Sequence, residues 1–189
     1  MATAMSIAAG ANPKALLAAL LCATVAASSL PGSSAAGASA LVSQTCRVTS
    51  NPSLCLELLR SSNRSDAATT VRELAVVAVT AARWSALRAR IRAADLSQGE
   101  AGGAAARLAA RCGALYADCL RAGAEALGRV STMRVHDPRA ADAMSALRRF
   151  PRKCAGLFHA RGIASPLEKV SRDTEEKLGV ASEIVRLSR

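Results

Sequence analysis

Alanine dominates this chain and limits its fold more than any other feature of the sequence. Of the 189 residues, 44 are alanine, and no clear alternating run of Val, Ile or Thr is present. Alanine is the strongest helix former, whereas strands are enriched in β-branched and aromatic residues. Aromatic residues make up only 2% of the chain, which also argues against a stacking surface for single-stranded nucleic acid. We therefore expect an all-α fold.

The first 40 residues have the layout of a secretory signal peptide. An apolar run at residues 15–27 follows Lys14, and small residues in A-x-A spacing follow it, ending at Ala40. The run is too short to span a bilayer as a stable helix, and no later segment is long and apolar enough to be a membrane helix. A plastid transit peptide is the alternative interpretation. We expect residues 1–40 to be removed and residues 41–189 to form the exported domain.

Apolar residues recur at helical spacing in four long segments of this domain, with Ile91 among the expected apolar positions. The segments are joined by short polar connections, which favour antiparallel neighbours in an up-down-up-down four-helix bundle. The expected helices run from about residue 66 to 94, from 104 to 130, from 138 onward, and from 165 to the C-terminus.

The residues at the helix starts support these boundaries. Asp66 is a favourable N-cap residue, and Asp137-Pro138 combines an N-cap residue with proline at the first helical position. Residues 165–168, Ser-Pro-Leu-Glu, have the pattern of a capping box. Pro151 is expected to interrupt the third helix just before Cys154, because proline lacks a backbone N–H.

Residues 41–61 are predicted to form a short helical hairpin. Asn51-Pro52 begins its second helix, and Cys46 and Cys55 flank the turn, so a bond between them would staple the hairpin. The sequence Asn63-Arg64-Ser65 follows in a polar connector and is an N-glycosylation sequon.

Five cysteines follow residue 40: Cys46, Cys55, Cys112, Cys119 and Cys154. An odd number in an oxidising compartment leaves at least one thiol unpaired. Cys112 and Cys119 lie seven residues apart in an expected helix, so their Cα atoms would be about 10 Å apart, beyond the ~7 Å limit for a disulfide. The other pairings stay open at this point.

The sequence contains no arrangement of residues typical of catalysis or metal binding. Neither His136 nor His159 has a partner at metal-ligand spacing, and both are expected to be exposed polar residues. Nucleophile-elbow, zinc-protease, phosphate-loop and EF-hand motifs are absent. Cys119 lies on an apolar helix face and is expected to be a buried small residue rather than a nucleophile. We therefore expect a protein that is not an enzyme, with no cofactor and no metal.

The formal net charge is +11, carried by 21 arginines and 4 lysines. Such a charge suits an acidic partner or a wall polyanion, and part of it is explained by solvated helix faces. Nuclear nucleic acid does not fit an exported chain. The basic residues cluster in two places: Arg88, Arg90 and Arg92, and Arg148, Arg149, Arg152 and Lys153.

Three motifs resemble those of the plant invertase and pectin methylesterase inhibitors. Residues 46–55, CRVTSNPSLC, are similar to that family's first pair of cysteines around an Asn/Thr-Pro turn. Cys112-x3-Tyr116 is similar to its Cys-x3-Tyr helix. Cys154-x3-Phe158, followed by Ser-Pro-Leu at 165–167, resembles its fourth cysteine and the start of its final helix.

The resemblance covers residues 41–189 and implies a helical hairpin that precedes a four-helix bundle. It also implies the bridges Cys46–Cys55 and Cys112–Cys154, which leave Cys119 unpaired. Members of the family block acid invertases or pectin methylesterases by occluding the substrate cleft.

In invertase inhibitors of this family a loop reading Asp-Pro-Lys-Phe enters the active site. The matching residues here are Asp137, Pro138 and Arg139, followed by Ala140 in place of the aromatic residue. Arginine keeps the positive charge, so the resemblance favours reversible one-to-one inhibition of an acid invertase (β-fructofuranosidase), with a pectin methylesterase as the close alternative. An ordinary helix start is the alternative role of Asp137-Pro138.

A function of another class also agrees with the charge. A basic, disulfide-stapled protein could bind pectin or another polyanion without inhibiting an enzyme. Binding to an anionic membrane is disfavoured, because no amphipathic helix with lipid-facing aromatic residues is present. No vacuolar sorting signal stands out, which favours the apoplast and cell wall over the vacuole.

Overall fold

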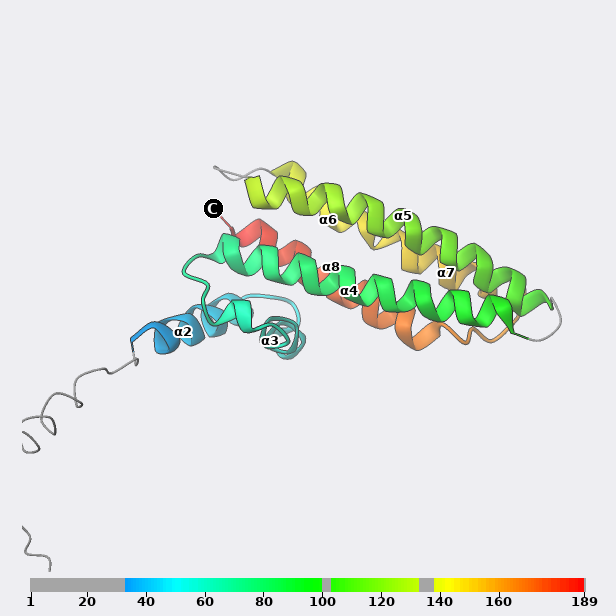
Figure 1. The fold of residues 1–189 in the computed structure, drawn as a ribbon, viewed down its shortest axis with the longest axis horizontal. Coiled ribbons are helices and arrows are strands. Elements are labelled where there is room, and N and C mark those ends of the chain that lie inside the picture. Colours follow the sequence, from blue (N-terminus) through cyan, green and yellow to red (C-terminus); the bar gives the residue numbers. More distant parts are fainter. Residues whose placement is uncertain (1–32, 100–102, 133–137, 189) are drawn as a thin grey trace, which may run out of the picture. The chain divides into compact units, whose positions relative to one another are not determined.

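Figure 1 shows the chain in a computed structural model that describes residues 33–99, 103–132 and 138–188. The chain divides into two compact units, residues 1–33 and 34–189, and every contact discussed below lies within the second. All regular structure in the described ranges is helical, which confirms the predicted all-α class. The proposed signal peptide falls largely outside these ranges and stays a prediction.

The second unit is a helix bundle with a hairpin before it. Helix α4 packs mainly against α5 and α8, and α6 and α7 together pack against the same two helices. Helices α6 and α7 therefore take the place of one bundle helix, as Figure 1 shows. Helix α3 of the hairpin contacts α4 and α8. The elements are α2 (Ser33–Arg47), α3 (Pro52–Arg60), the 3-10 turn η1 (Asn63–Ser65), α4 (Val71–Gln98), α5 (Ala104–Thr132), α6 (Pro138–Leu147), α7 (Arg149–His159) and α8 (Glu168–Leu187).

Alanine makes up most of the inner face of α4. The buried alanines recur every three or four residues, which is the period of one helix face. Small side chains at helix contacts allow the helix axes to approach closely. The fully buried alanines are Ala75, Ala78, Ala82, Ala86, Ala89 and Ala93.

The start of α4 differs from the prediction. The N-cap is Thr70 rather than Asp66: its Oγ1 accepts a hydrogen bond from the backbone N–H of Glu73 at 3.2 Å. In return, Glu73 Oε2 accepts from the backbone N–H groups of Thr69 and Thr70, at 2.6 and 3.1 Å. These hydrogen bonds lower the pKa of Glu73. A complete capping box satisfies more helix-end donors than Asp66 alone, so the helix begins there.

Two other predicted boundaries were also wrong. The third bundle helix breaks at Arg148, between α6 and α7, and Pro151 lies in the first turn of α7. A proline is tolerated there because a first-turn N–H has no partner within the helix. Helix α8 begins at Glu168 with Leu167 as N-cap, and no side chain caps it. Instead, Ser165 Oγ accepts from the N–H of Leu167 at 3.2 Å, which makes a turn before the helix.

Both disulfides implied by the family resemblance are present. Cys46–Cys55 joins α2 to α3, and Cys112–Cys154 joins α5 to α7, with Cα atoms 5.4 and 5.0 Å apart. Cys119 is unpaired and buried. Helix α5 is continuous from residue 104 to 132, as the argument against a Cys112–Cys119 bond required.

Removal of the two disulfides is expected to have unequal effects on stability. Replacing Cys112 and Cys154 (sequence separation 42) with alanine should lower the free energy of unfolding by about 4 kcal/mol. The same change at Cys46 and Cys55 (separation 9) should lower it by about 2–3 kcal/mol, because the closed loop is shorter. Denaturant titration followed by circular dichroism measures both losses.

The single variant Cys119→Ala is the matched control, since it removes a buried sulfur but no bond. Its expected cost is about 1 kcal/mol. Equal losses in the two double variants would contradict loop closure as the source of the difference.

Candidate functional site

The residues expected to contact a target lie where α5 ends and α6 begins. Pro138 is the first residue of α6, Arg139 follows it, and both are exposed. The predicted helix start at Pro138 is therefore confirmed. Asp137 lies outside the described residues, so its predicted roles as N-cap and as target contact stay predictions.

The residue after Arg139 faces the bundle core. Ala140 is 0% exposed and Ala141 is 2% exposed. The resemblance aligns Ala140 with the aromatic residue of the invertase-inhibitor loop. Because position 140 points inward in this chain, the exposed residues of the motif that the structure describes are Pro138 and Arg139.

Helix electrostatics gives no reason for a cation at Arg139. The first turn of α6 contains no acidic residue. The N-terminus of a helix carries a partial positive charge, so a cation in the first turn costs a few tenths to about 1 kcal/mol. The macrodipole of α6 therefore does not favour this arginine.

Helix α6 is held on α8 by polar side chains, which fixes the place of the junction. Ser182 Oγ donates to the carbonyl oxygen of Ala141 at 3.3 Å and lies 2.7 Å from Ser145 Oγ. Arg186 donates to Ser145 Oγ at 3.0 Å and lies 3.9 Å from the carboxylate of Asp142. The start of α6 therefore rests on a rigid support rather than on a loop.

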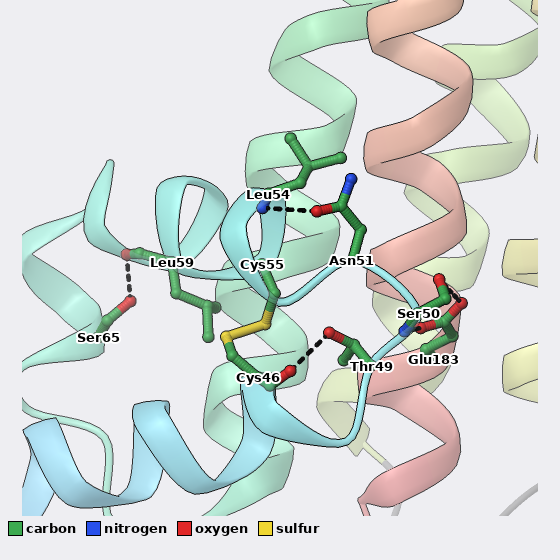
Figure 2. The surroundings of a disulfide bond; sticks show 9 residues. All are labelled: Cys46, Thr49, Ser50, Asn51, Leu54, Cys55, Leu59, Ser65 and Glu183. Carbon is green, nitrogen blue, oxygen red and sulfur yellow. Dashed lines mark hydrogen bonds between the residues drawn. A yellow bond between two sulfur atoms is a disulfide. The ribbon is translucent and has the colours of Figure 1, made fainter.

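The turn of the hairpin is built around its disulfide (Figure 2). Thr49 Oγ1 donates to the carbonyl oxygen of Cys46 at 2.8 Å, which closes the end of α2. Asn51 caps α3, because its Oδ1 accepts from the backbone N–H of Leu54 at 3.1 Å. The predicted hairpin boundaries near residues 49–52 are confirmed.

One carboxylate connects this turn to the bundle. The backbone N–H and the hydroxyl of Ser50 donate to the two carboxylate oxygens of Glu183 in α8, at 2.8 and 2.7 Å (Figure 2). The two residues are 133 positions apart. Sequence reasoning missed this contact, because neither residue belongs to a motif that points to the other.

The predicted glycosylation site lies just beyond the hairpin. Asn63 is exposed at the start of η1, whereas Ser65 is buried and its hydroxyl donates to the carbonyl oxygen of Leu59 at 2.6 Å. The side chain that would carry a glycan therefore faces solvent.

The family model for plant invertase/pectin methylesterase inhibitors matches residues 40–185. The chain belongs to this family. The match includes the hairpin, both disulfides and nearly all of α8. A comparison with curated proteins finds no match to the chain. Members of the family are inhibitors rather than enzymes.

The interior of this inhibitor-family bundle contains two groups that burial keeps neutral. Tyr116 is 0% exposed and donates its hydroxyl to Ser171 Oγ at 2.8 Å, and burial raises its pKa to about 12. Burial likewise raises the pKa of Cys119 to about 12, with nearby Arg83 opposing the shift. A thiol in this state is a poor nucleophile, in agreement with the prediction of a buried small residue.

Metal ligands do not gather in the described part of the chain, where no group of three His, Cys, Asp or Glu residues could hold an ion. His159 is exposed, as predicted, and His136 lies outside the described residues. The described helices include none that is long and apolar enough to cross a membrane.

The second basic cluster is largely structural. Arg148 and Arg152 both donate to Glu175 Oε1, at 3.2 and 2.6 Å, which ties α7 to α8. The guanidinium of Arg149 lies 4.8 Å from the centre of the Phe150 ring, in a cation–π contact. Contacts within the protein therefore account for these three arginines.

A shallow groove lies between α5 and α7, with a volume of about 550 Å³. Its apolar surface comes from Leu115 and Leu157, with the small residues Ala114 and Gly156 beside them. Charged side chains line its edges: Arg111, Asp118 and Lys153. This groove is a second surface on which a protein partner could dock.

Burial of the Cys119 thiol predicts that it reacts slowly in the native protein. At about pH 8, Cys119 in the native protein should react with an aromatic disulfide reagent at least about a hundredfold more slowly than in denaturant, because its thiolate is rare and its sulfur is covered. Absorbance of the released thiol measures the rate.

The variant Cys119→Ala should release no thiol in either state. Similar rates in native and unfolded protein would contradict burial of Cys119 and would make a disulfide-linked dimer the expected species on a non-reducing gel.

Proposed function

We propose that the protein is a secreted inhibitor that binds an acid invertase in a reversible one-to-one complex and occludes its substrate cleft. The family match over residues 40–185 carries the inhibitor assignment. The exposed Pro138-Arg139 pair at the rigidly held start of α6 supports invertase as the target.

Inhibition of this kind needs no bond-making by the inhibitor. A rigid scaffold lowers the entropy cost of association, and the disulfides and the α6–α8 contacts supply that rigidity. Invertases are glycosidases, whose clefts contain a pair of carboxyl groups. The planar guanidinium of Arg139 can form two parallel hydrogen bonds with one carboxylate.

A pectin methylesterase is the alternative target. For that target the groove between α5 and α7 is the contact surface we propose, because Leu115 and Leu157 offer an apolar centre with charged edges, which is the usual composition of a protein interface. A basic wall protein that binds polyanions without inhibiting an enzyme is the alternative of another class.

Titration of both enzymes with the purified protein separates these functions. The activity of acid invertase and of pectin methylesterase is followed against protein concentration at mildly acidic pH. We expect saturable loss of invertase activity. The variant Arg139→Ala should weaken that inhibition by about tenfold or more, the effect of losing a hydrogen bond between charged groups.

The matched control is Arg161→Ala, which removes the same charge from an exposed position between α7 and α8. It should inhibit as the unmodified protein does. Equal inhibition by the Arg139→Ala protein would remove the role assigned to Arg139. Loss of esterase activity alone would identify pectin methylesterase as the target. If neither activity fell, polyanion binding without inhibition would be the remaining function.

We further propose that the protein is exported to the apoplast or cell wall. Family members are typically extracellular, and Asn63, the residue of the sequon that would carry a glycan, is exposed. Protein expressed in plant cells should therefore carry a glycan at Asn63. Enzymatic deglycosylation should lower its mass, whereas the variant Asn63→Gln should show no shift. If deglycosylation left the mass of the protein without the substitution unchanged, that result would contradict glycosylation of Asn63.

A further inference from the structure

One face of α4 carries large side chains that no other helix covers. Trp84 is 59% exposed and Ile91 is 53% exposed. Arg88 lies between them on the same helix face, since the three positions follow helical spacing. Ile91 was expected on the core side of this helix, and the structure corrects that prediction.

Trp84 lies at a groove between α3 and α4, with a volume of about 610 Å³. Leu58, Val77 and Ala81 give the groove an apolar surface, and the hydroxyls of Ser61 and Thr80 line it. These hydroxyls donate to backbone carbonyl oxygens of their own helices, which leaves their oxygens able to accept. A concave apolar surface with a few polar groups is typical of a small-molecule site.

A partly buried polar network holds Arg88 at the groove. Lys177 is 8% exposed, and its Nζ lies 2.8 Å from Asp173 Oδ1. Ser85 Oγ donates to Asp173 Oδ2 at 2.7 Å, and Arg88 donates to Ser85 Oγ at 3.2 Å. This one hydrogen bond to Ser85 positions the guanidinium of Arg88. A guanidinium has five N–H donors, so others remain for a ligand.

The carboxylates of the groove are already engaged. Glu73 is occupied by the capping box of α4, and Glu57 lies 3.6 Å from Lys177 Nζ. On the opposite side, the guanidinium of Arg64 has no hydrogen bond or ion pair with another described residue. The groove therefore offers two guanidinium groups to an anion.

We propose that this groove binds an acidic oligosaccharide, a chain of sugar rings that carry carboxylates. The flat indole of Trp84 can pack on the apolar face of a sugar ring. Arg88 and Arg64 can each pair with a ring carboxylate, and guanidinium–carboxylate pairs are the strongest hydrogen-bonded pairs of this type. From Val76 to Arg88 the groove follows α4 for about 18 Å, which is long enough for several rings.

A second copy of the chain fits this surface less well than a polyanion does. Each chain carries a net charge of +11, so two copies repel each other. Binding of the sugar is independent of the proposed enzyme inhibition. It would retain the protein on a polymer rich in uronic acid.

Binding in the groove can be followed by intrinsic fluorescence, because Trp84 is the one tryptophan of the chain. The purified protein is titrated with oligogalacturonate at low salt and mildly acidic pH, and the tryptophan emission is recorded. We expect a saturable change of emission. The fully methyl-esterified oligomer, which lacks the charges, should bind at least about tenfold more weakly.

Two variants separate a built site from general attraction to a polyanion. Arg88→Ala should weaken binding by about tenfold or more. Arg90→Ala removes the same charge two positions away, on a different face of α4, and should change affinity less than about twofold. Both are compared in the Asn63→Gln background, because a glycan at Asn63 would lie beside Arg64.

Three results would overturn the proposal. The first is the absence of a saturable emission change together with the absence of heat in calorimetry. The second is equal weakening by Arg88→Ala and Arg90→Ala, which would indicate non-specific polyanion attraction. The third is an emission change that follows protein concentration without sugar, which would identify a second copy as the occupant. No enzyme is present in the assay, so failure of the proposed inhibition would leave it unaffected.

Discussion

The close contact of α4 with α5 and α8 through buried alanines is the constraint on which the rest of the structure depends. Alanine favours the helix and allows close approach, but each buried methyl group contributes only about 0.8 kcal/mol of burial energy. Along residues 82–93 the buried face of α4 therefore has no large side chain to stabilise it. The disulfides Cys46–Cys55 and Cys112–Cys154 add stability by restricting the unfolded chain, and larger buried side chains such as Tyr116, Phe158 and Leu178 fill the rest of the interior.

The same constraint explains why large side chains appear on the outside of α4. Along residues 82–93, where every buried residue of α4 is alanine or serine, a branched or aromatic side chain at the contact would force the helices apart. Trp84 and Ile91 therefore occupy the face that no bundle helix covers. The sequence pattern predicted a helix around Ile91 correctly, but it did not show which side of that helix is buried. In a helix with so many alanines, the apolar stripe extends around much of the circumference.

Much of the fold could be predicted because its signals are local or belong to the family. Helical period and the Asn51-Pro52 turn each act within a few residues, and they predict the bundle and the hairpin. Both bridges were predicted from the resemblance to the family, because local patterns left the pairing of the cysteines open. The errors arose where two local signals competed: Asp66 lost to the complete capping box of Thr70 and Glu73, and Pro151 was accommodated in a first turn. The contact between Ser50 and Glu183 could not be predicted, because it depends on how α8 packs against the hairpin.

Helix α8 connects the two surfaces for which we propose functions. Ser182 bonds to α6, while its neighbour Glu183 bonds to the hairpin turn, so consecutive residues fix two different elements. Earlier in the same helix, by about one and a half and two and a half turns, Lys177 and Asp173 form the polar network that supports Arg88 at the groove. Both surfaces are thereby held by one central helix rather than by flexible loops, and they share no residue. Occupation of the groove leaves the start of α6 in place, so an inhibitor retained on an acidic polymer would keep the surface with which it meets its target.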